Sequence, residues 1–173
     1  MVRPRQCLSL LVIILVAAAG ACTGPKTDTF TQGGGSMEPT VRAGQVITVR
    51  EVGPDDTINR GDIVLFHPSG GRWGDSKSSF LKRVIAVGGD TIACCDYVGA
   101  VTVNGTRLDE PYVTKNSPLD AVPNPTTCVS RRFEEVKLDP DTLFVMGDNR
   151  VQSNDSRCQG PIPVSSVFAV MTT

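Results

Sequence analysis

Glycine and proline divide this chain, from residue 26 onward, into short runs rich in β-branched residues. Clear examples are QVITVREV at Gln45–Val52, DIVLF at Asp62–Phe66 and FLKRVIAV at Phe80–Val87. Runs of this length, bounded by turn-forming residues, are typical of β-strands. No segment after residue 25 keeps the 3.6-residue period of an amphipathic helix. The chain is therefore predicted to be mainly β, with antiparallel strands.

The second half of the chain continues this pattern. Asn104-Gly105 lies at the centre of a predicted type I′ hairpin, because both residues accept positive φ. The stretch Pro111–Thr127 holds four prolines and little apolar pattern, so it is interpreted as a surface excursion and a candidate lid. Further strands are predicted at Thr91–Cys95, Ala100–Leu108, Arg132–Leu138, Leu143–Met146 and Val164–Met171.

The N-terminus has the pattern of an export segment. Arg3 and Arg5 precede an apolar run, Leu8–Ala21, that is nearer the length of a signal peptide core than of a full membrane span. We predict that residues 1–24 form a signal segment or membrane anchor, with the N-terminus cytoplasmic and the remainder outside. Cys22 is a candidate site of cleavage or lipidation. The polar, glycine-rich residues 25–35 are expected to form a tether.

Charge and cysteine content narrow the partners. A chain of 173 residues with a formal net charge of −1 lacks the basic footprint of a nucleic-acid-binding protein, so no such partner is expected. Six cysteines fit an exported protein, in which disulfides persist. We hypothesise one bridge that joins Cys94 or Cys95 to Cys128. No Cys/His pair has zinc spacing, and no metal or organic cofactor is expected.

Ser36 is a candidate nucleophile because it follows three glycines, which allow a ligand to approach the backbone closely. A serine hydroxyl needs a base to attack at neutral pH. The sole histidine, His67, stands in a Phe-His-Pro turn and is a weak candidate.

Lys82 is the alternative base. Strand alternation places it on one face with Phe80, Val84 and Ala86, so that burial would lower its pKa towards 8 and leave a neutral amine. The competing interpretation is an edge-strand lysine that extends to water.

A third polar segment, Met146–Arg157, packs turn formers and opposite charges together. It fits a solvated turn, and it equally fits a rigid shelf that holds a hydroxyl such as Ser153 against the base.

Together these segments resemble the type I signal peptidases, membrane-bound Ser/Lys endopeptidases that remove signal peptides from exported proteins. Four motifs match in the order of that family and span most of the exported part. They are Ser36-Met37-x-Pro39-Thr40, Arg60-Gly61-Asp62-Ile63-Val64, Lys82-Arg83-Val84-x-x-Val87-x-Gly89-Asp90 and Gly147-Asp148-Asn149-Arg150-x-x-Ser153-x-Asp155-Ser156-Arg157.

The resemblance implies a role for each matching residue. Ser36 is the acylated nucleophile, its backbone N–H helps to bind the oxyanion, and Lys82 is the general base. Gly34 takes a position at which some family members place an extra serine donor. Ser153 is expected to orient Lys82. The site is expected to be supported by Asp148, Asp155, Arg157 and Arg83, and the shallow pockets for small substrate side chains to be lined by Phe30, Met37 and Leu81.

The resemblance also implies an architecture. It predicts a catalytic β core at residues 36–90 and 141–173, an inserted second β-region at 91–140, and an N-terminal membrane anchor. Residues 25–35 then form the edge of the substrate groove as well as a tether. The expected partners are preprotein signal peptides, cut after Ala-x-Ala sites, and membrane lipid.

Several other functions share part of this pattern. Self-cleaving repressors resemble the same Ser/Lys core, but they are cytosolic and carry a DNA-binding module that this chain lacks. The penicillin-binding class requires Ser-x-x-Lys, whereas the third residue after Ser36 is Pro39. A specialised relative that serves a single substrate stays open. So does a non-catalytic exported β-domain, anchored by lipid at Cys22, that binds peptides.

Overall fold

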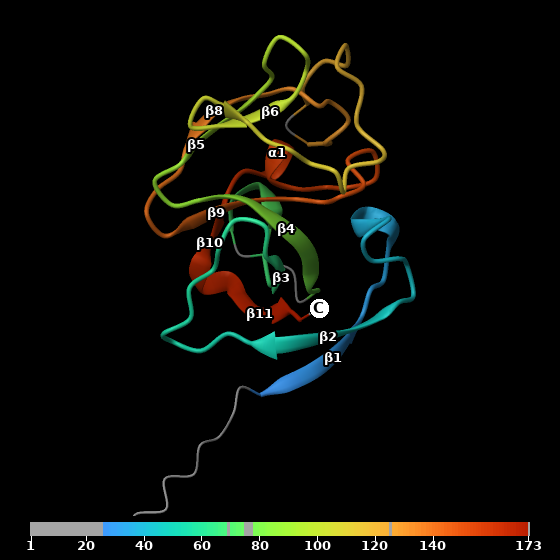
Figure 1. The fold of residues 1–173 in the computed structure, drawn as a ribbon, viewed down its shortest axis with the longest axis vertical. Coiled ribbons are helices and arrows are strands. Elements are labelled where there is room, and N and C mark those ends of the chain that lie inside the picture. The colour runs from blue at the N-terminus through green and yellow to red at the C-terminus, as the bar shows by residue number, and fades with distance from the viewer. Residues whose placement is uncertain (1–25, 69, 75–77, 125, 173) are drawn as a thin grey trace, which may run out of the picture.

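The computed structural model describes residues 26–68, 70–74, 78–124 and 126–172. These residues form two antiparallel sheets, and Figure 1 shows the smaller sheet stacked above the larger one. The prediction of a mainly β chain is confirmed. The predicted anchor, residues 1–24, lies outside the described residues, as do Cys7 and Cys22. Within the described ranges, no helix is long and apolar enough to cross a membrane.

The larger sheet has seven strands in the order β1-β2-β11-β3-β4-β9-β10. Its strands are β1 (Thr27–Thr31), β2 (Val46–Glu51), β11 (Val167–Met171), β3 (Ile63–Phe66), β4 (Phe80–Val87), β9 (Thr142–Met146) and β10 (Ile162–Pro163). The smaller sheet has four strands in the order β7-β6-β5-β8. They are β7 (Thr106–Arg107), β6 (Val101–Val103), β5 (Thr91–Cys94) and β8 (Phe133–Lys137).

The helical elements are short. They are the 3₁₀ turns η1 (Gly35–Met37), η2 (Gly71–Trp73) and η3 (Val164–Ser166), and the single-turn helix α1 (Ser156–Gln159). The predicted hairpin is confirmed: β6 pairs with β7, and Asn104 and Gly105 both have positive φ.

One hydrophobic cluster joins the two sheets. From the larger sheet it takes Ile85, Ala86, Phe144 and Met146. From the smaller sheet it takes Ile92, Cys94, Val101, Val103 and Phe133. The four-stranded sheet therefore packs through buried apolar side chains onto β4 and β9, the strands next to the active-site segments.

Strand alternation along β4 holds only as far as Val84. The pairing with β9 shifts register between Val84 and Ala86, so that two residues of β4 face one residue of β9. Ala86 was expected on the same face as Val84, but it packs into the cluster between the sheets, while Val84 and Val87 share a different cluster. A bulge cannot be recognised from the apolar pattern, because every residue involved is apolar.

The segment expected to be a tether contains a strand. Thr27–Thr31 forms β1 and pairs with β2 along its whole length, from Thr27 opposite Arg50 to Thr31 opposite Val46. Within β1, Phe30 is half-buried and the other residues are exposed. The segment therefore lacks the apolar alternation by which a strand is recognised in a sequence. Backbone hydrogen bonds to β2 hold it in place.

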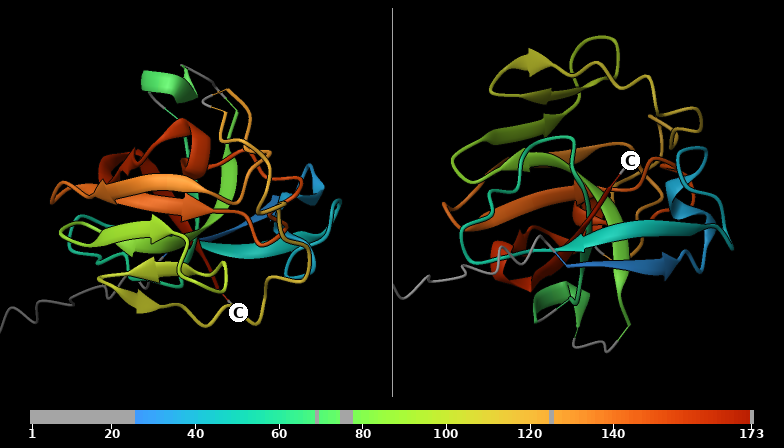
Figure 2. Two further views of the ribbon diagram at one scale, coloured as in Figure 1. Left: turned by 90° about the horizontal axis from the view of Figure 1, so that it is seen from above. Right: turned by 60° about the horizontal axis from the view of Figure 1, so that its bottom comes forward.

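The hypothesised disulfide between Cys94 or Cys95 and Cys128 is wrong. Cys94 is bonded to Cys95, and Cys128 is bonded to Cys158. Cys94 ends β5 inside the small sheet, whereas Cys128 lies in the long connection between β7 and β8. Figure 2 shows that connection, yellow to orange, leaving the small sheet and running back beside the large one, where Cys158 lies on α1.

We expect the Cys128–Cys158 bond to be the major covalent contribution to stability. It joins residues 30 positions apart. In the chain-entropy model, closing a loop of this length in the unfolded chain raises the free energy of unfolding by about 3–4 kcal/mol. The Cys128→Ala/Cys158→Ala variant should therefore unfold at markedly lower urea concentration, measured by fluorescence at pH 7. Cys94→Ala/Cys95→Ala is the control, because its bond joins neighbours and closes no long loop. Equal losses in the two variants would contradict this account.

Candidate active site

Ser36 lies in the middle of η1, directly after the glycines that follow β1. The turn is fixed by the backbone, since Glu38 N donates to Gly35 O at 3.2 Å and Val41 N donates to Met37 O at 2.9 Å. Met37 is fully buried and anchors the turn in the hydrophobic core. The Ser36 carbonyl accepts a hydrogen bond of 3.0 Å from Asn149 N. The position of Ser36 thus depends on two segments more than a hundred residues apart.

Lys82 lies on β4, opposite Val64 of β3, and its amine reaches Ser36. Lys82 Nζ donates to Ser36 Oγ at 3.0 Å and to the carbonyl of Leu81, also at 3.0 Å. Only 4% of Lys82 is exposed. This burial lowers the pKa of Lys82 to about 8, although the nearby Asp155 and Asp148 carboxylates act in the opposite direction.

The buried Asp148 and the half-buried Arg83 form an ion pair beside Ser36 and Lys82. Arg83 Nε donates to Asp148 Oδ1 at 2.9 Å and Nη2 donates to Oδ2 at 2.7 Å, which is a bidentate arrangement. Thr40 Oγ1 also donates to the Asp148 carboxylate, and Arg83 Nη1 donates to Gly61 O. Asp148 therefore joins the segment after Ser36 to β4, which carries Lys82.

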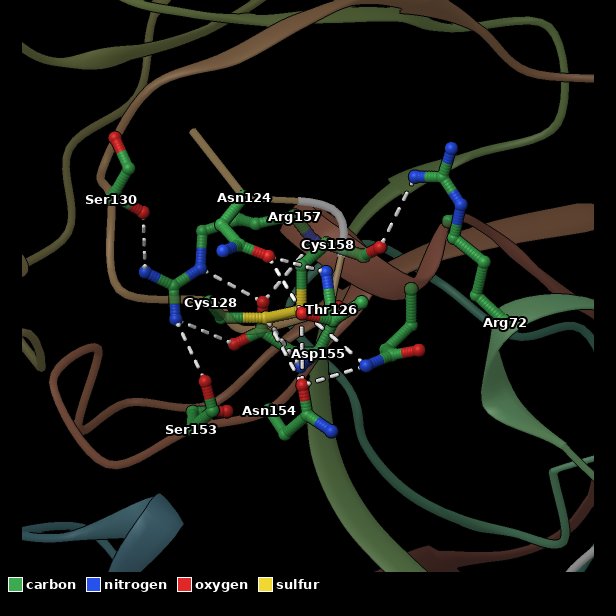
Figure 3. The surroundings of a disulfide bond; sticks show 12 residues. Arg72, Asn124, Thr126, Cys128, Ser130, Ser153, Asn154, Asp155, Arg157 and Cys158 are labelled. Atoms are coloured by element: carbon green, nitrogen blue, oxygen red, sulfur yellow. Dashed lines mark hydrogen bonds and ion pairs between the residues drawn. A yellow bond between two sulfur atoms is a disulfide. The ribbon is translucent and has the colours of Figure 1, made fainter. Parts of the chain in front are cut away.

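Asp155 and Arg157 form a second bidentate pair at the start of α1. Arg157 Nε lies 2.8 Å from Asp155 Oδ1, and Nη2 lies 3.0 Å from Oδ2. Burial by itself would raise the pKa of Asp155, but the charge and hydrogen bonds of Arg157 outweigh it and hold that pKa below its ordinary value. Figure 3 shows this pair beside the Cys128–Cys158 bond, and Cys128 Sγ accepts from Asp155 N at 3.1 Å.

Ser153 forms hydrogen bonds with other residues of the polar segment Met146–Arg157, which we call the shelf. Its Oγ accepts from Gly147 N at 3.1 Å, and its carbonyl accepts from Arg157 Nη2 at 3.1 Å. Among the hydrogen bonds of the described residues, none joins Ser153 to Lys82. Gly147 has no room for a side chain, because a Cβ atom there would collide with Ser36 O and Ser153 Oγ. Gly147 therefore packs closely against both Ser36 and Ser153.

The three residues expected to line substrate pockets share one hydrophobic cluster. Met37 and Leu81 are buried members, and Phe30 packs against them from β1. The cluster adjoins Ser36, which precedes Met37 in η1, and Lys82, which follows Leu81 in β4. The structure thus brings these three side chains together next to the dyad.

His67 does not approach Ser36. Its ring stacks on Phe168 of β11 with 4.5 Å between centroids, and its backbone N–H donates to Ser166. Within the described residues, the side chain hydrogen-bonded to Ser36 Oγ is that of Lys82.

Sequence reasoning missed four residues that hold the shelf. Arg150 is buried and pairs with Glu110, while Tyr112 and Ser117 contact Arg83 and Arg157. Arg150 belongs to the quoted motif, but Glu110, Tyr112 and Ser117 come from the proline-rich connection. No periodicity or spacing pairs residues that lie this far apart in the chain, so the sequence offered no signal for these contacts.

The chain was also compared with known proteins. A family model described as "Signal peptidase, peptidase S26" matches residues 5–173. A signal peptidase I of Bacillus caldolyticus is 33% identical over 137 residues, which cover 78% of this chain and 71% of that protein. A signal peptidase I of Bacillus licheniformis is 37% identical over 130 residues, covering 72% and 62% of the two chains.

A shorter match has higher identity. A signal peptidase I of Mycobacterium tuberculosis (strain ATCC 25618 / H37Rv) is 42% identical over 86 residues, which cover 50% of this chain and 29% of that protein. The chain thus spans between 29% and 71% of the length of these relatives. Since the family model covers nearly the whole chain, and the motifs that carry the resemblance lie within it, this protein belongs to the signal peptidase family, peptidase S26.

Proposed function

We propose that this protein cleaves signal peptides from exported preproteins, with Ser36 as nucleophile and Lys82 as general base. The observation that carries the proposal is the 3.0 Å separation of Lys82 Nζ and Ser36 Oγ, in a site where the amine is buried. A lysine that is neutral near physiological pH can accept a proton, whereas an exposed lysine cannot. The family membership supports the choice of substrate.

The reaction follows from this geometry. As Ser36 Oγ attacks the scissile carbonyl carbon, its proton passes to the neutral Lys82 amine. The resulting ammonium group then donates that proton to the leaving amine when the peptide C–N bond breaks, and an ester to Ser36 remains. Lys82, neutral again, takes a proton from a water molecule as that water attacks the ester carbon, and returns it to Ser36 Oγ when the ester C–O bond breaks and the acid is released. The Leu81 carbonyl holds the amine towards Ser36 throughout, because it accepts one of its N–H bonds.

The oxyanion of the tetrahedral intermediate requires fixed donors. We assign one of them to the Ser36 backbone N–H. The preceding carbonyl, Gly35 O, accepts from Glu38 N at 3.2 Å and from Asn149 Nδ2 at 3.1 Å. These bonds fix the plane of the Gly35–Ser36 peptide and hence the direction of its N–H.

Substrate is proposed to bind as an extended strand near β1, which is the end strand of the large sheet and, among the described strands, is paired on one edge only. Gly33 and Gly34 follow β1, and apart from their chain neighbours no described residue lies within 4 Å of the position that a Cβ would take in either glycine. Phe30, Met37 and Leu81 then limit the pockets to small side chains, which accounts for an Ala-x-Ala preference.

We propose three further features of the protein. Ser153 is proposed to orient Lys82 indirectly, through Gly147 and the packing of Ser36. Residues 91–140 are proposed to be an inserted region, since the small sheet is built from Thr91–Lys137. Residues 1–24 are proposed to anchor the protein to membrane lipid as a single pass with the catalytic part outside.

We expect purified protein to cut a preprotein after an Ala-x-Ala site, and Ser36→Ala and Lys82→Ala to abolish cleavage while the fold persists. The rate should rise about tenfold per pH unit below the lysine pKa and level off above it, because only the neutral amine accepts a proton; that pKa is about 8. Mass spectrometry of the products, at pH values from 6 to 10, measures both the position of the cut and the rate of cleavage. Ser165→Ala, an exposed serine of η3, is the matched control. Cleavage that survives in Ser36→Ala would exclude Ser36 as the nucleophile.

Lys82→Met should make the folded protein more stable at pH 7. The folded-state pKa of about 8 lies below the ordinary 10.5, so below pH 8 the folded state carries the full penalty of a buried ammonium, about 3 kcal/mol. The penalty disappears as pH rises from 8 to 10.5, and the gain from the substitution should disappear with it. Urea denaturation at several pH values measures the effect, with Lys26→Met at an exposed position as control. A gain that does not change with pH would contradict burial as its cause.

A further inference from the structure

A segment of the proposed insert, Glu110–Ser117, lies against the catalytic shelf. Lys115 forms a parallel bridge with Asn149, and Arg150 N donates to Lys115 O at 3.0 Å. None of the named helices or strands includes this segment, so these contacts, rather than secondary structure, hold it in place. The same short segment supplies a side chain to each of three arginines of the site.

The three contacts differ in chemistry. The Glu110 carboxylate accepts from Arg150 Nη2 at 2.6 Å and from Nη1 at 3.2 Å. The ring of Tyr112 faces the Arg83 guanidinium, with 4.1 Å to the ring centroid. Ser117 Oγ accepts from Arg157 Nη1 at 3.0 Å. Of these, the Glu110 contact is the one that neutralises a buried charge.

Arg150 transmits this contact to the nucleophile. Its side chain is 1% exposed, and its Nε donates to the Gly147 carbonyl at 2.9 Å. Gly147 packs directly against Ser36 O, leaving no space for a methyl group. Two residues later in the chain, the backbone N–H of Asn149 donates to the same Ser36 carbonyl. A connected set of polar contacts therefore runs from Glu110 through Arg150 and Gly147 to Ser36.

We propose that Glu110 is a positioning residue for the peptidase reaction, and that it acts through Arg150 to hold Gly147 against Ser36. The inference rests on the proposed function of Ser36 and adds to it a residue from outside the catalytic motifs. Glutamine at this position keeps the size of the side chain but removes the ion-pair partner of Arg150, so we expect the guanidinium to turn towards water and release the Gly147 carbonyl. The nucleophile then loses its fixed position relative to Lys82, while the substrate pockets formed by Phe30, Met37 and Leu81 stay intact.

The test is a double-mutant cycle on the full-length protein with an Ala-x-Ala preprotein as substrate. Glu110→Gln should lower kcat at least tenfold and change KM by less than about threefold, since positioning affects the chemical step more than binding. In an Arg150→Met background the same substitution should have no further effect, because the two residues act as one unit. The neighbouring exposed Asp109→Asn is the matched control and should leave kcat unchanged.

Amide hydrogen exchange at Gly147 and Asn149 gives a readout that does not depend on activity. Exchange at both amides should become faster in Glu110→Gln and stay at the wild-type rate in Asp109→Asn. Should wild type cleave no preprotein, the proposed function fails, and the exchange rates still decide whether Glu110 holds the shelf. Wild-type kcat together with wild-type exchange in Glu110→Gln overturns the inference.

If Glu110→Gln does not fold, the double variant tests the proposal in its place. Glu110→Gln/Arg150→Met removes both charges and leaves neither one buried and unpaired. It should fold, with fast exchange at Gly147 and a kcat at least tenfold below wild type. A folded double variant with wild-type kcat would show that neither residue positions the nucleophile.

Discussion

Much of this structure is arranged around one buried amine, that of Lys82. Lys82 lies on β4, between β3 and β9, and its Nζ meets Ser36 Oγ at 3.0 Å. An ammonium group in such a place is unfavourable, and the pKa of Lys82 falls to about 8 as a result. In the proposed reaction, the burial that destabilises the folded state is also what allows the amine to act as a base. A sheet that places apolar residues around β4 is therefore a functional requirement as well as a structural one.

The other buried charges behave differently. Apart from Lys82, each charged side chain that is buried in the described part of the chain belongs to an ion pair. The pairs are Arg60–Asp90, Arg83–Asp148, Arg150–Glu110 and Arg157–Asp155. Paired in this way, the charges add directional hydrogen bonds that hold the shelf rigid. Among the described residues, no carboxylate forms an ion pair with Lys82. Such a partner would stabilise the charged form of Lys82 and raise its pKa again. The distribution of pairs thus keeps the pKa of Lys82 low, at about 8, within a rigid polar frame.

The sequence predicted the parts of this arrangement that depend on local pattern. The runs of β-branched residues became strands at the expected places, and strand alternation placed Lys82 among apolar neighbours. The failures involve contacts between distant segments. β1 has a polar sequence and exists because β2 offers a partner; the bulge at Val84–Ala86 depends on pairing with β9; and the disulfide of Cys128 depends on where α1 lies. Glu110 was missed for the same reason, because its partner Arg150 is defined only by the fold.

These long-range contacts join the small sheet to the proposed catalytic site. The cluster that joins the sheets contains Phe144 and Met146 of β9, and the chain passes from Met146 directly into Gly147 of the shelf. The connection between β7 and β8 contributes Glu110, Tyr112 and Ser117 to the arginines of the site, and Cys128 to α1. Removing residues 91–140 would expose the apolar faces of β4 and β9 and leave Arg150 buried without its ion-pair partner. We therefore expect the proposed catalytic core to be unstable by itself, because both sheets contribute the contacts that hold Ser36 and Lys82 in place.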